Sequence, residues 1–167
     1  MADGGASTMI ILVASLIVSG AASVVLIDSW GSLAEASGHV TSKRSADAET
    51  DVSIGGDRSN VLFTENAGDD EITLYFVNSG STNLDMSDYA VFVDGTALGT
   101  GDSSTLYPSS GTIWGPGSVL EVVVSDSSFE DYVDDQIVTV MIVVNSEVSS
   151  GFSGTSTANE EVRLNVG

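Results

Sequence analysis

The sequence predicts an α+β lollipop, in which a long N-terminal hydrophobic α-helix is followed by an all-β immunoglobulin-like sandwich. Two observations favour this fold class. No charged residue occurs among the 24 residues from Gly4 to Ile27. Beyond residue 43, β-branched and aromatic runs are separated by clusters of Gly, Ser, Asn and Asp, as in strands joined by turns. We therefore expect a transmembrane or filament-core helix over residues 1–42 and a β-sandwich head over residues 43–167.

Composition excludes several classes of function. The 167 residues include 24 Asp and Glu, four Lys and Arg, one His and no Cys, which gives a net charge of −20. A nucleic-acid partner is not expected, because binding phosphates requires a basic face. Without cysteine there are no disulfides or thiolate sites, and one histidine leaves little room for histidine-based catalysis. An acidic surface of this strength is stable when salt screens its self-repulsion, so we favour a halophilic source over a moderately acidic extracellular protein.

The N-terminal helix is predicted from about residue 5 to about residue 42. As a helix, the uncharged stretch alone measures about 36 Å, against about 30 Å for the hydrocarbon core of a bilayer. No proline follows through Ser42, so the helix is expected to continue out of the membrane or bundle. The large apolar residues expected in that membrane or bundle core are Ile10, Ile11, Leu12, Leu16, Ile17, Val24 and Leu26.

Small residues recur along one side of this helix. Ser15, Ser19 and Ser23 are spaced by four, and Ala22 lies beside them. Small side chains let helices approach closely, so these four residues are the predicted helix–helix assembly site. The alternative is a single-span anchor whose serines have no such role. A secretory signal peptide is not predicted, because the basic n-region is missing and the apolar stretch is too long.

The head is predicted to contain seven strands and two weaker ones. Alternation is clearest around Ile72–Val77 and Val138–Val144, where apolar residues on most positions indicate strands at the centre of a sandwich. Residues 99–104 and 149–157 are rich in Gly and Ser, and we expect flexible connections there. The expected strands are 50–54, 61–64, 71–78, 89–94, 119–125, 137–144 and 161–166, with weaker ones at 97–98 and 104–107.

No catalytic, cofactor or metal site is predicted. Acidic clusters occur at residues 65–71 and 126–135 and could supply oxygens for calcium or magnesium, but neither has EF-hand spacing. We interpret them as solvated loops. His39, near the end of the helix, is expected to be a solvated surface residue. The N-x-Ser/Thr sequon is absent from the sequence, so N-glycosylation is not expected.

Several short motifs resemble those of a known family. Residues 7–18 (STMIILVASLIV) are similar to the N-terminal helix of archaeal type IV pilin-like proteins, most of all to the FlaG (ArlG) family of archaellar stator proteins. In the head, residues 72–84 match a pattern of a strand followed by Asn-x-Gly and Ser or Thr. Residues 91–95 and 114–120 resemble later strands of these domains. The Lys/Arg-Gly processing site of archaellins is not seen before the helix, so we expect the N-terminal segment to be retained.

The resemblance implies a structural, non-enzymatic role without cofactors. Proteins of this family are expected to self-assemble through their N-terminal helices into a filament between the cell membrane and the S-layer. The implied partners are further copies of the chain, the sister stator protein FlaF and through it the S-layer, the archaellum motor, and the membrane itself. The head would then lie in the extracytoplasmic (pseudoperiplasmic) space. The alternatives are an archaellin or adhesive type IV pilin forming an extracellular filament, and a membrane-anchored module that binds a metal or carbohydrate.

Overall fold

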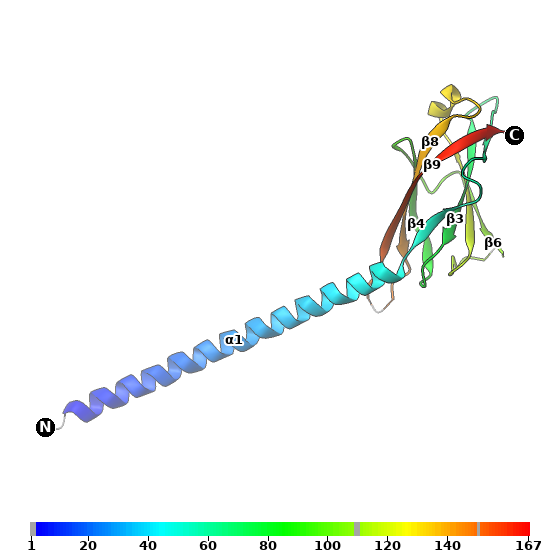
Figure 1. Ribbon diagram of the computed structural model, residues 1–167. Helices are drawn as coiled ribbons and strands as arrows, with labels where there is room; N and C mark the ends of the chain where they lie inside the picture. Colours follow the sequence, from blue (N-terminus) through cyan, green and yellow to red (C-terminus); the bar gives the residue numbers. More distant parts are fainter. Residues whose placement is uncertain (1–2, 109–110, 150) are drawn as a thin grey trace. The chain divides into compact units, whose positions relative to one another are not determined.

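The computed structural model describes residues 3–108, 111–149 and 151–167 (Figure 1). It contains one long helix, α1 (Asp3–Glu49), followed by a β-rich domain. The predicted order of a long apolar helix and an all-β head is confirmed. The chain divides into two compact units, Met1–Ser42 and Lys43–Gly167, so the last seven residues of α1 belong to the same unit as the strands.

The helix extends seven residues beyond the predicted end near residue 42. Residues 43–49 contain no Gly or Pro, and Lys43 faces Asp47 one turn later with Nζ 3.4 Å from Oδ1, a spacing that supports a helix. The backbone N–H of Thr50 still donates to Ala46 O at 3.1 Å, after which the chain becomes extended.

Among the residues that the structure describes, nine strands form the head. They belong to two sheets, A and B, and Figure 1 shows their course. Sheet A contains β1 (Val52–Gly55), β2 (Val61–Thr64), β3 (Glu71–Asn78), β7 (Val119–Ser125) and β6 (Ser103–Tyr107). Sheet B contains β5 (Thr96–Gly99), β4 (Leu84–Val93), β8 (Ile137–Ser146) and β9 (Thr155–Val166). A short 3-10 helix, η1 (Ser127–Asp131), precedes β8.

The strand β9 joins the two sheets. Its first nine residues, Thr155–Arg163, pair antiparallel with β8, while Leu164–Val166 pair in parallel with β2. β3 is central in sheet A, with β7 on one side and both β1 and β2 along its other side. The two sheets enclose one core, as expected of an immunoglobulin-like sandwich.

Most predicted strands coincide with observed ones to within two residues, but two begin five or more residues earlier than expected. β4 begins at Leu84 rather than Tyr89, because Leu84 pairs with Ser146 before the register shifts. β9 begins at Thr155 rather than at residue 161, so part of the segment expected to be flexible is a strand. Its polar residues alternate outward while the backbone is held along the full length of β8.

Fully buried aromatic and aliphatic side chains fill the core. Trp114 has no exposed surface, and the Tyr89 ring packs edge-on against it with centroids 6.0 Å apart. The strands alternate between this core and the outside. On sheet A the outward residues form what we call the outer face of sheet A, namely Glu71, Thr73, Tyr75 and Val77 of β3, Val119, Glu121, Val123 and Ser125 of β7, and Ser103, Thr105 and Tyr107 of β6.

Candidate assembly site and the helix–head junction

The apolar residues predicted for the membrane or bundle core are all exposed on α1. Ile10, Ile11, Leu12, Leu16, Ile17, Val24 and Leu26 each leave between 59% and 71% of their surface open in the single chain. By length and composition the helix segment Gly5–Glu49 is sufficient to cross a membrane. Side chains this apolar require a bilayer or neighbouring helices as their surroundings.

The predicted small-residue site forms a compact patch on α1. At about 100° per residue, Ser15, Ser19, Ala22 and Ser23 fall within an arc of about 100° and about 12 Å of helix length. Leu12 and Leu26 lie in the same arc, one turn beyond each end of the patch. The Ser15 hydroxyl donates to Leu12 O at 2.9 Å and the Ser23 hydroxyl to Ser19 O at 2.8 Å. These hydroxyls are therefore satisfied within the helix and suited to an apolar environment.

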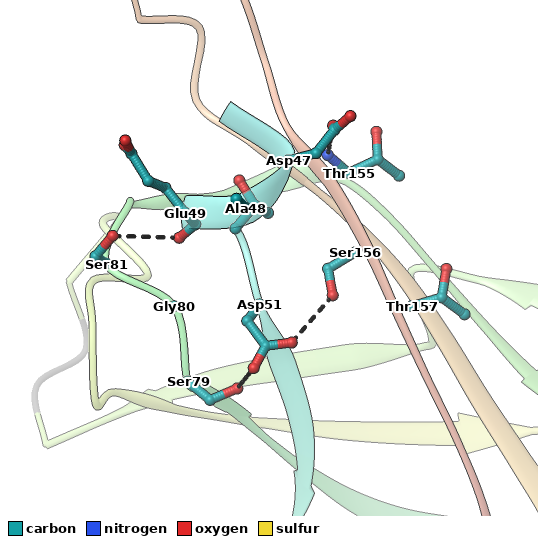
Figure 2. Close-up of a pocket in the computed structure, with 11 residues that line it drawn as sticks. Asp47, Ala48, Glu49, Asp51, Ser79, Gly80, Ser81, Thr155, Ser156 and Thr157 are labelled. Carbon is teal, nitrogen blue, oxygen red and sulfur yellow. Dashed lines mark hydrogen bonds between the residues drawn. The ribbon is translucent and has the colours of Figure 1, made fainter. Parts of the chain in front are cut away.

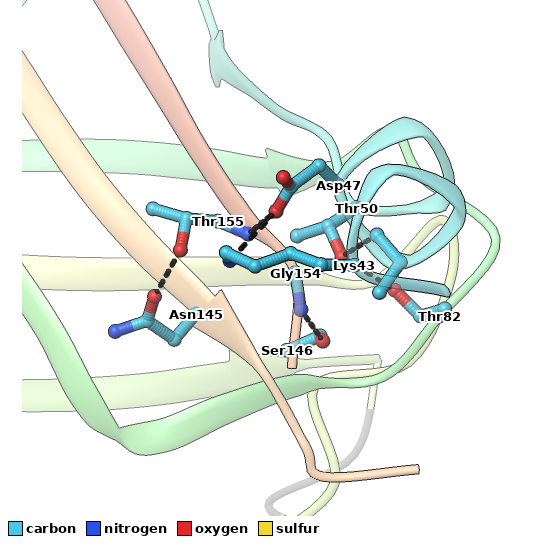
Figure 3. A network of polar contacts seen from close by, with 9 residues as sticks. Lys43, Asp47, Thr50, Thr82, Asn145, Ser146, Gly154 and Thr155 are labelled. Atoms are coloured by element: carbon cyan, nitrogen blue, oxygen red, sulfur yellow. Dashed lines mark hydrogen bonds and ion pairs between the residues drawn. The ribbon is translucent and has the colours of Figure 1, made fainter. Parts of the chain in front are cut away.

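A second site, which was not predicted from the sequence, holds the end of α1 beside the loop after β3 and the start of β9. We call it the junction, and it consists of residues 43–51, 79–82, 145–146 and 154–156 (Figures 2 and 3). The loop after β3 caps the last helical turn: the Ser81 N–H donates to Glu49 O at 2.8 Å. The Thr50 hydroxyl donates to Ala46 O at 2.8 Å and lies 3.2 Å from the hydroxyl of Thr82. Carbonyls left open at a helix end are thus satisfied by the head.

The start of β9 provides the other side of the junction (Figure 3). Asp47 Oδ1 accepts a hydrogen bond from the N–H of Thr155 at 3.0 Å, and the same oxygen faces Lys43. The Ser146 hydroxyl accepts from the N–H of Gly154 at 2.8 Å, and the Thr155 hydroxyl donates to Asn145 at 2.7 Å. These contacts fix the hairpin between β8 and β9 beside the final turn of α1.

Asp51 connects the loop after β3 with β9 (Figure 2). One of its carboxylate oxygens accepts from the Ser79 hydroxyl at 2.8 Å, and the other accepts from the Ser156 hydroxyl at 3.3 Å. Around these residues the surface forms an open, polar hollow of about 690 Å³. The polar groups that line this hollow hydrogen-bond mainly to each other. We therefore interpret the hollow as a surface feature of the junction.

Two glycines allow the backbones of the junction to approach closely. A Cβ at Gly80 would lie 2.6 Å from both Asp51 N and Glu49 O. A Cβ at Gly154 would overlap the carbonyl of Ala46 and the hydroxyl of Thr50. Both positions therefore require the absence of a side chain, because the atoms opposite belong largely to the backbone.

The Asn-x-Gly motif noted in the sequence has a direct role here. The buried Asn78 side chain donates to Thr82 O and to Trp114 O, each at 2.8 Å, and its Oδ1 accepts from the Gly80 N–H at 3.0 Å. This side chain shapes the loop of residues 79–82 and ties it to the loop that carries Trp114. The motif thus positions the groups that cap α1.

The acidic loops have structural roles in the described part of the chain. Asp126 caps η1 by accepting a hydrogen bond from the Ser128 N–H. Hydrogen bonds from the Ser128 hydroxyl and from that N–H lower the pKa of the Asp126 carboxyl. Asp70 accepts from the N–H of Asn66 at 2.9 Å. Among the described residues, no group of three or more His, Cys, Asp or Glu side chains could hold a metal ion. His39 lies on the exposed surface of α1, with Nε2 3.9 Å from the carboxylate of Glu35.

Sequence reasoning missed the junction because its members are far apart in the chain. Asp47 and Thr155 are separated by 108 positions and Thr50 and Thr82 by 32. The one available signal was the Asn-x-Gly motif, whose spacing indicates a tight turn without showing what the turn contacts.

The described residues thus form a helix long and apolar enough to cross a membrane, and a β-sandwich head that hydrogen-bonds the last turn of that helix. The sequence model of a family described as archaeal-type flagellin matches residues 2–163. The chain belongs to this family, which is a family of structural proteins of the archaellum. The resemblance to the archaeal pilin-like superfamily is thereby confirmed.

Other comparisons add little to this assignment. No curated protein matches the chain. The similar solved structures include the crystal structure of the periplasmic chaperone SfaE, with 16% identity and a TM-score of 0.25. That match covers 69% of this chain and 55% of the chaperone chain, so the chain spans about half the length of the chaperone.

Proposed function

We propose that the chain is a stator subunit of the archaellum, similar to FlaG (ArlG), that self-assembles through α1 into a filament between the cell membrane and the S-layer. The observation that carries the proposal is the continuous helix Asp3–Glu49, apolar and exposed at one end and hydrogen-bonded to the head at the other. The likeness of residues 7–18 and 72–84 to stator proteins supports the stator class within the flagellin family.

The physical role follows from these two ends. In the assembled state, the apolar part of α1 would be surrounded by lipid and by neighbouring helices in contact through Ser15, Ser19, Ala22 and Ser23. The head would lie on the extracytoplasmic side. A rotary motor exerts torque on its stator, so a subunit that links membrane and envelope must transmit force without unfolding locally. The junction supplies this resistance, because the last helical turn accepts hydrogen bonds from the loop after β3 and from the start of β9.

The partners in this proposal are further copies of the chain, the motor, and FlaF as the link to the S-layer. A second candidate function is that of a filament subunit, an archaellin or an adhesive pilin. The family match over residues 2–163 favours that candidate equally, because it describes the flagellin family as a whole.

Electron microscopy of the purified full chain tests self-assembly, which we expect to give filaments. Deletion of the gene in its host separates the two candidates. A stator subunit is expected to leave external filaments in place while swimming stops, whereas loss of the external filaments themselves would identify a filament subunit. Protein that stays dispersed under conditions in which the head is folded would contradict both.

A further inference from the structure

One basic side chain on α1 has no carboxylate partner in the described part of the chain. Three of the four Lys and Arg side chains form ion pairs, namely Lys43 with Asp47, Arg58 with Glu160, and Arg163 with Asp135. Among the residues that the structure describes, Arg44 is the one Lys or Arg without such a pair, although it is exposed and the chain carries 24 Asp and Glu. Its guanidinium donors are therefore available to a group outside the chain.

Arg44 lies at the end of a regular series of positions on the continuous helix α1. Counting back by alternating steps of four and three residues gives Val40, Ser37, Leu33 and Trp30. The Trp30, Leu33 and Val40 side chains are 68%, 61% and 52% exposed in the single chain. At about 100° per residue, all five positions fall within an arc of about 80°. We call these five residues the outer stripe of α1.

The other ionisable residues of this stretch lie on a different side of the helix. Asp28, Glu35, His39 and Lys43 also fall within an arc of about 80°, whose centre is about 140° from the centre of the outer stripe. The outer part of α1 is therefore amphipathic, and Arg44 is the charged residue at the end of its apolar side. A helix of this kind buries its apolar side against another element.

The outer stripe continues the predicted helix–helix site. Extending the count from Trp30 leads through Leu26 to Ser23 and Ser19, two residues of that site. All four residues of the site lie in the same arc of about 100° as the outer stripe. Spacings that alternate between three and four repeat every seven residues, a period that keeps one side of two supercoiled helices face to face over many turns. Two copies of α1 in contact through the small residues therefore bring their outer stripes together.

We propose that the outer stripe is the surface on which the α1 helix of a second copy packs outside the membrane, and that Arg44 pairs there with a carboxylate of that copy. The inference rests on the proposed self-assembly. It adds a helix contact beyond the bilayer and an ion pair between subunits at the end of that contact.

Distance along the helix argues against lipid as the partner of Arg44. Ile27 is the last residue of the uncharged stretch, and Arg44 follows it by about 25 Å of helix. The headgroup region on one side of a bilayer is about 5–8 Å thick. A helix tilt of about 40° still leaves Arg44 about 20 Å beyond the end of the uncharged stretch. Lipid phosphates are therefore out of its reach.

Charge favours a second copy as the occupant. With a net charge of −20, each chain carries many carboxylates that no cation of its own can pair. Arg is suited to such a partner, because its planar guanidinium binds a carboxylate through two parallel hydrogen bonds. Acidic neighbours otherwise repel each other, so a cation at the end of the apolar contact offsets part of that repulsion where the helices meet.

Two serine positions test the helix contact, because the natural chain has no cysteine. Ser37→Cys places a thiol on the outer stripe, and the control Ser42→Cys places one about 140° around the helix. The purified full chain is placed in vesicles at low and at high protein density, and the rate of labelling by a membrane-permeant maleimide is measured. Electron microscopy records filaments in the same samples. We expect Ser37→Cys to react about tenfold more slowly at high density, as for a site occupied about nine-tenths of the time, and Ser42→Cys to react equally fast at both.

Neutral variants of two adjacent cations test the ion pair. Arg44→Gln removes the unpaired guanidinium, whereas Lys43→Gln removes a cation that already faces Asp47 in its own chain. In the Ser37→Cys background at high density, we expect Arg44→Gln to speed labelling about twofold to fivefold, the effect of one exposed ion pair, and Lys43→Gln to leave the rate unchanged. Arg44→Lys is expected to keep part of the protection. Raising KCl should reduce the effect of Arg44→Gln, because salt screens an exposed ion pair. Thermal unfolding of each variant verifies that the head is folded.

The outcomes separate this inference from the proposed function. A Ser37→Cys protein that reacts equally fast at both densities overturns the inference, whether or not filaments form. Filaments with an unprotected Ser37→Cys leave the proposed self-assembly intact and reject the outer stripe as its continuation. Equal protection of Ser42→Cys also rejects the outer stripe, and equal effects of Arg44→Gln and Lys43→Gln overturn the ion pair. Protection confined to Ser37→Cys without filaments supports the contact between copies and counts against the filament.

Discussion

Asp47 on the last turn of α1 accepts a hydrogen bond from the backbone N–H of Thr155 at the start of β9, with 3.0 Å between Oδ1 and N. The bond joins positions 108 residues apart, so it forms only once the helix end, the loop after β3 and the β8–β9 hairpin have come together. It shows that the head does not begin where the strands begin. The final helical turn is part of the same unit.

Replacing Asp47 with Ala is therefore expected to loosen the start of β9. The N–H of Thr155 loses its acceptor, and Lys43 loses its carboxylate partner one turn away. Amide hydrogen exchange should show faster exchange at Thr155 and its neighbours. The control is Asp69→Ala, which also removes one exposed carboxylate from the head. Equal exchange at Thr155 in the two variants would show that Asp47 does not fix the hairpin.

Alanine at Gly154 is expected to destabilise the head by about 1–3 kcal/mol, the usual cost of overpacking. The added Cβ would overlap the Ala46 carbonyl and the Thr50 hydroxyl. Thermal unfolding of Gly154→Ala and of Gly68→Ala provides the comparison. A Cβ at Gly68 meets nothing within 4 Å, so that variant is expected to unfold close to the wild-type temperature. A Gly154→Ala protein as stable as Gly68→Ala would mean that the junction accommodates the added Cβ without loss of stability.

The helix patch can be tested by two neighbouring substitutions. Ala22→Leu adds bulk within the predicted helix–helix site, whereas Ala21→Leu adds the same bulk about 100° around the helix and outside the patch. We expect Ala22→Leu, like Ser19→Leu, to reduce filament yield strongly and Ala21→Leu to have a small effect. Sedimentation of assembled protein measures the yield. The reverse order would place the contact on another side of α1.

Salt is expected to stabilise the isolated head. A soluble fragment of residues 43–167 carries a net charge of −17 and keeps the whole junction. Raising KCl from about 0.1 M to about 1 M shortens the screening length from about 10 Å to about 3 Å, which removes most of the repulsion between carboxylates. Melting temperatures across a KCl series should rise steeply. A rise that instead saturates at millimolar calcium and vanishes with EDTA would indicate bound ions, and a constant melting temperature would reject the halophilic interpretation.

Tyr132 is expected to make the head sensitive to alkali. Partial burial, with a further contribution from its hydrogen bond to Asp94, raises the pKa of the Tyr132 phenol from 10.0 to about 12. Because the folded pKa lies above the unfolded one, the stabilisation is complete below pH 10.0 and is lost as the pH rises toward about 12. Absorbance titration of phenolate should show a late step that Tyr132→Phe removes. A Tyr132→Phe protein with an unchanged late step would assign it to another tyrosine.

Several elements of the fold could be predicted from the sequence because their signal is local. Strands β2, β3 and β7 lie at the predicted residues, since alternation and flanking turn residues determine them without reference to neighbours. The apolar helix could also be predicted, because an uncharged stretch of 24 residues is typical of a helix that spans a membrane or packs among other helices. The acidic head was likewise evident from composition alone.

Tertiary structure decided the rest. Residues 43–49 stay helical while the head caps their last turn, and Thr155–Glu160 form a strand because β8 pairs with them although their own pattern is polar. Gly80 and Gly154 appeared as ordinary loop glycines in the sequence, and only the approach of backbones from distant segments makes a side chain at either position unfavourable. Contacts between distant segments leave no periodic trace in a sequence, so the junction became visible only once the chain was folded.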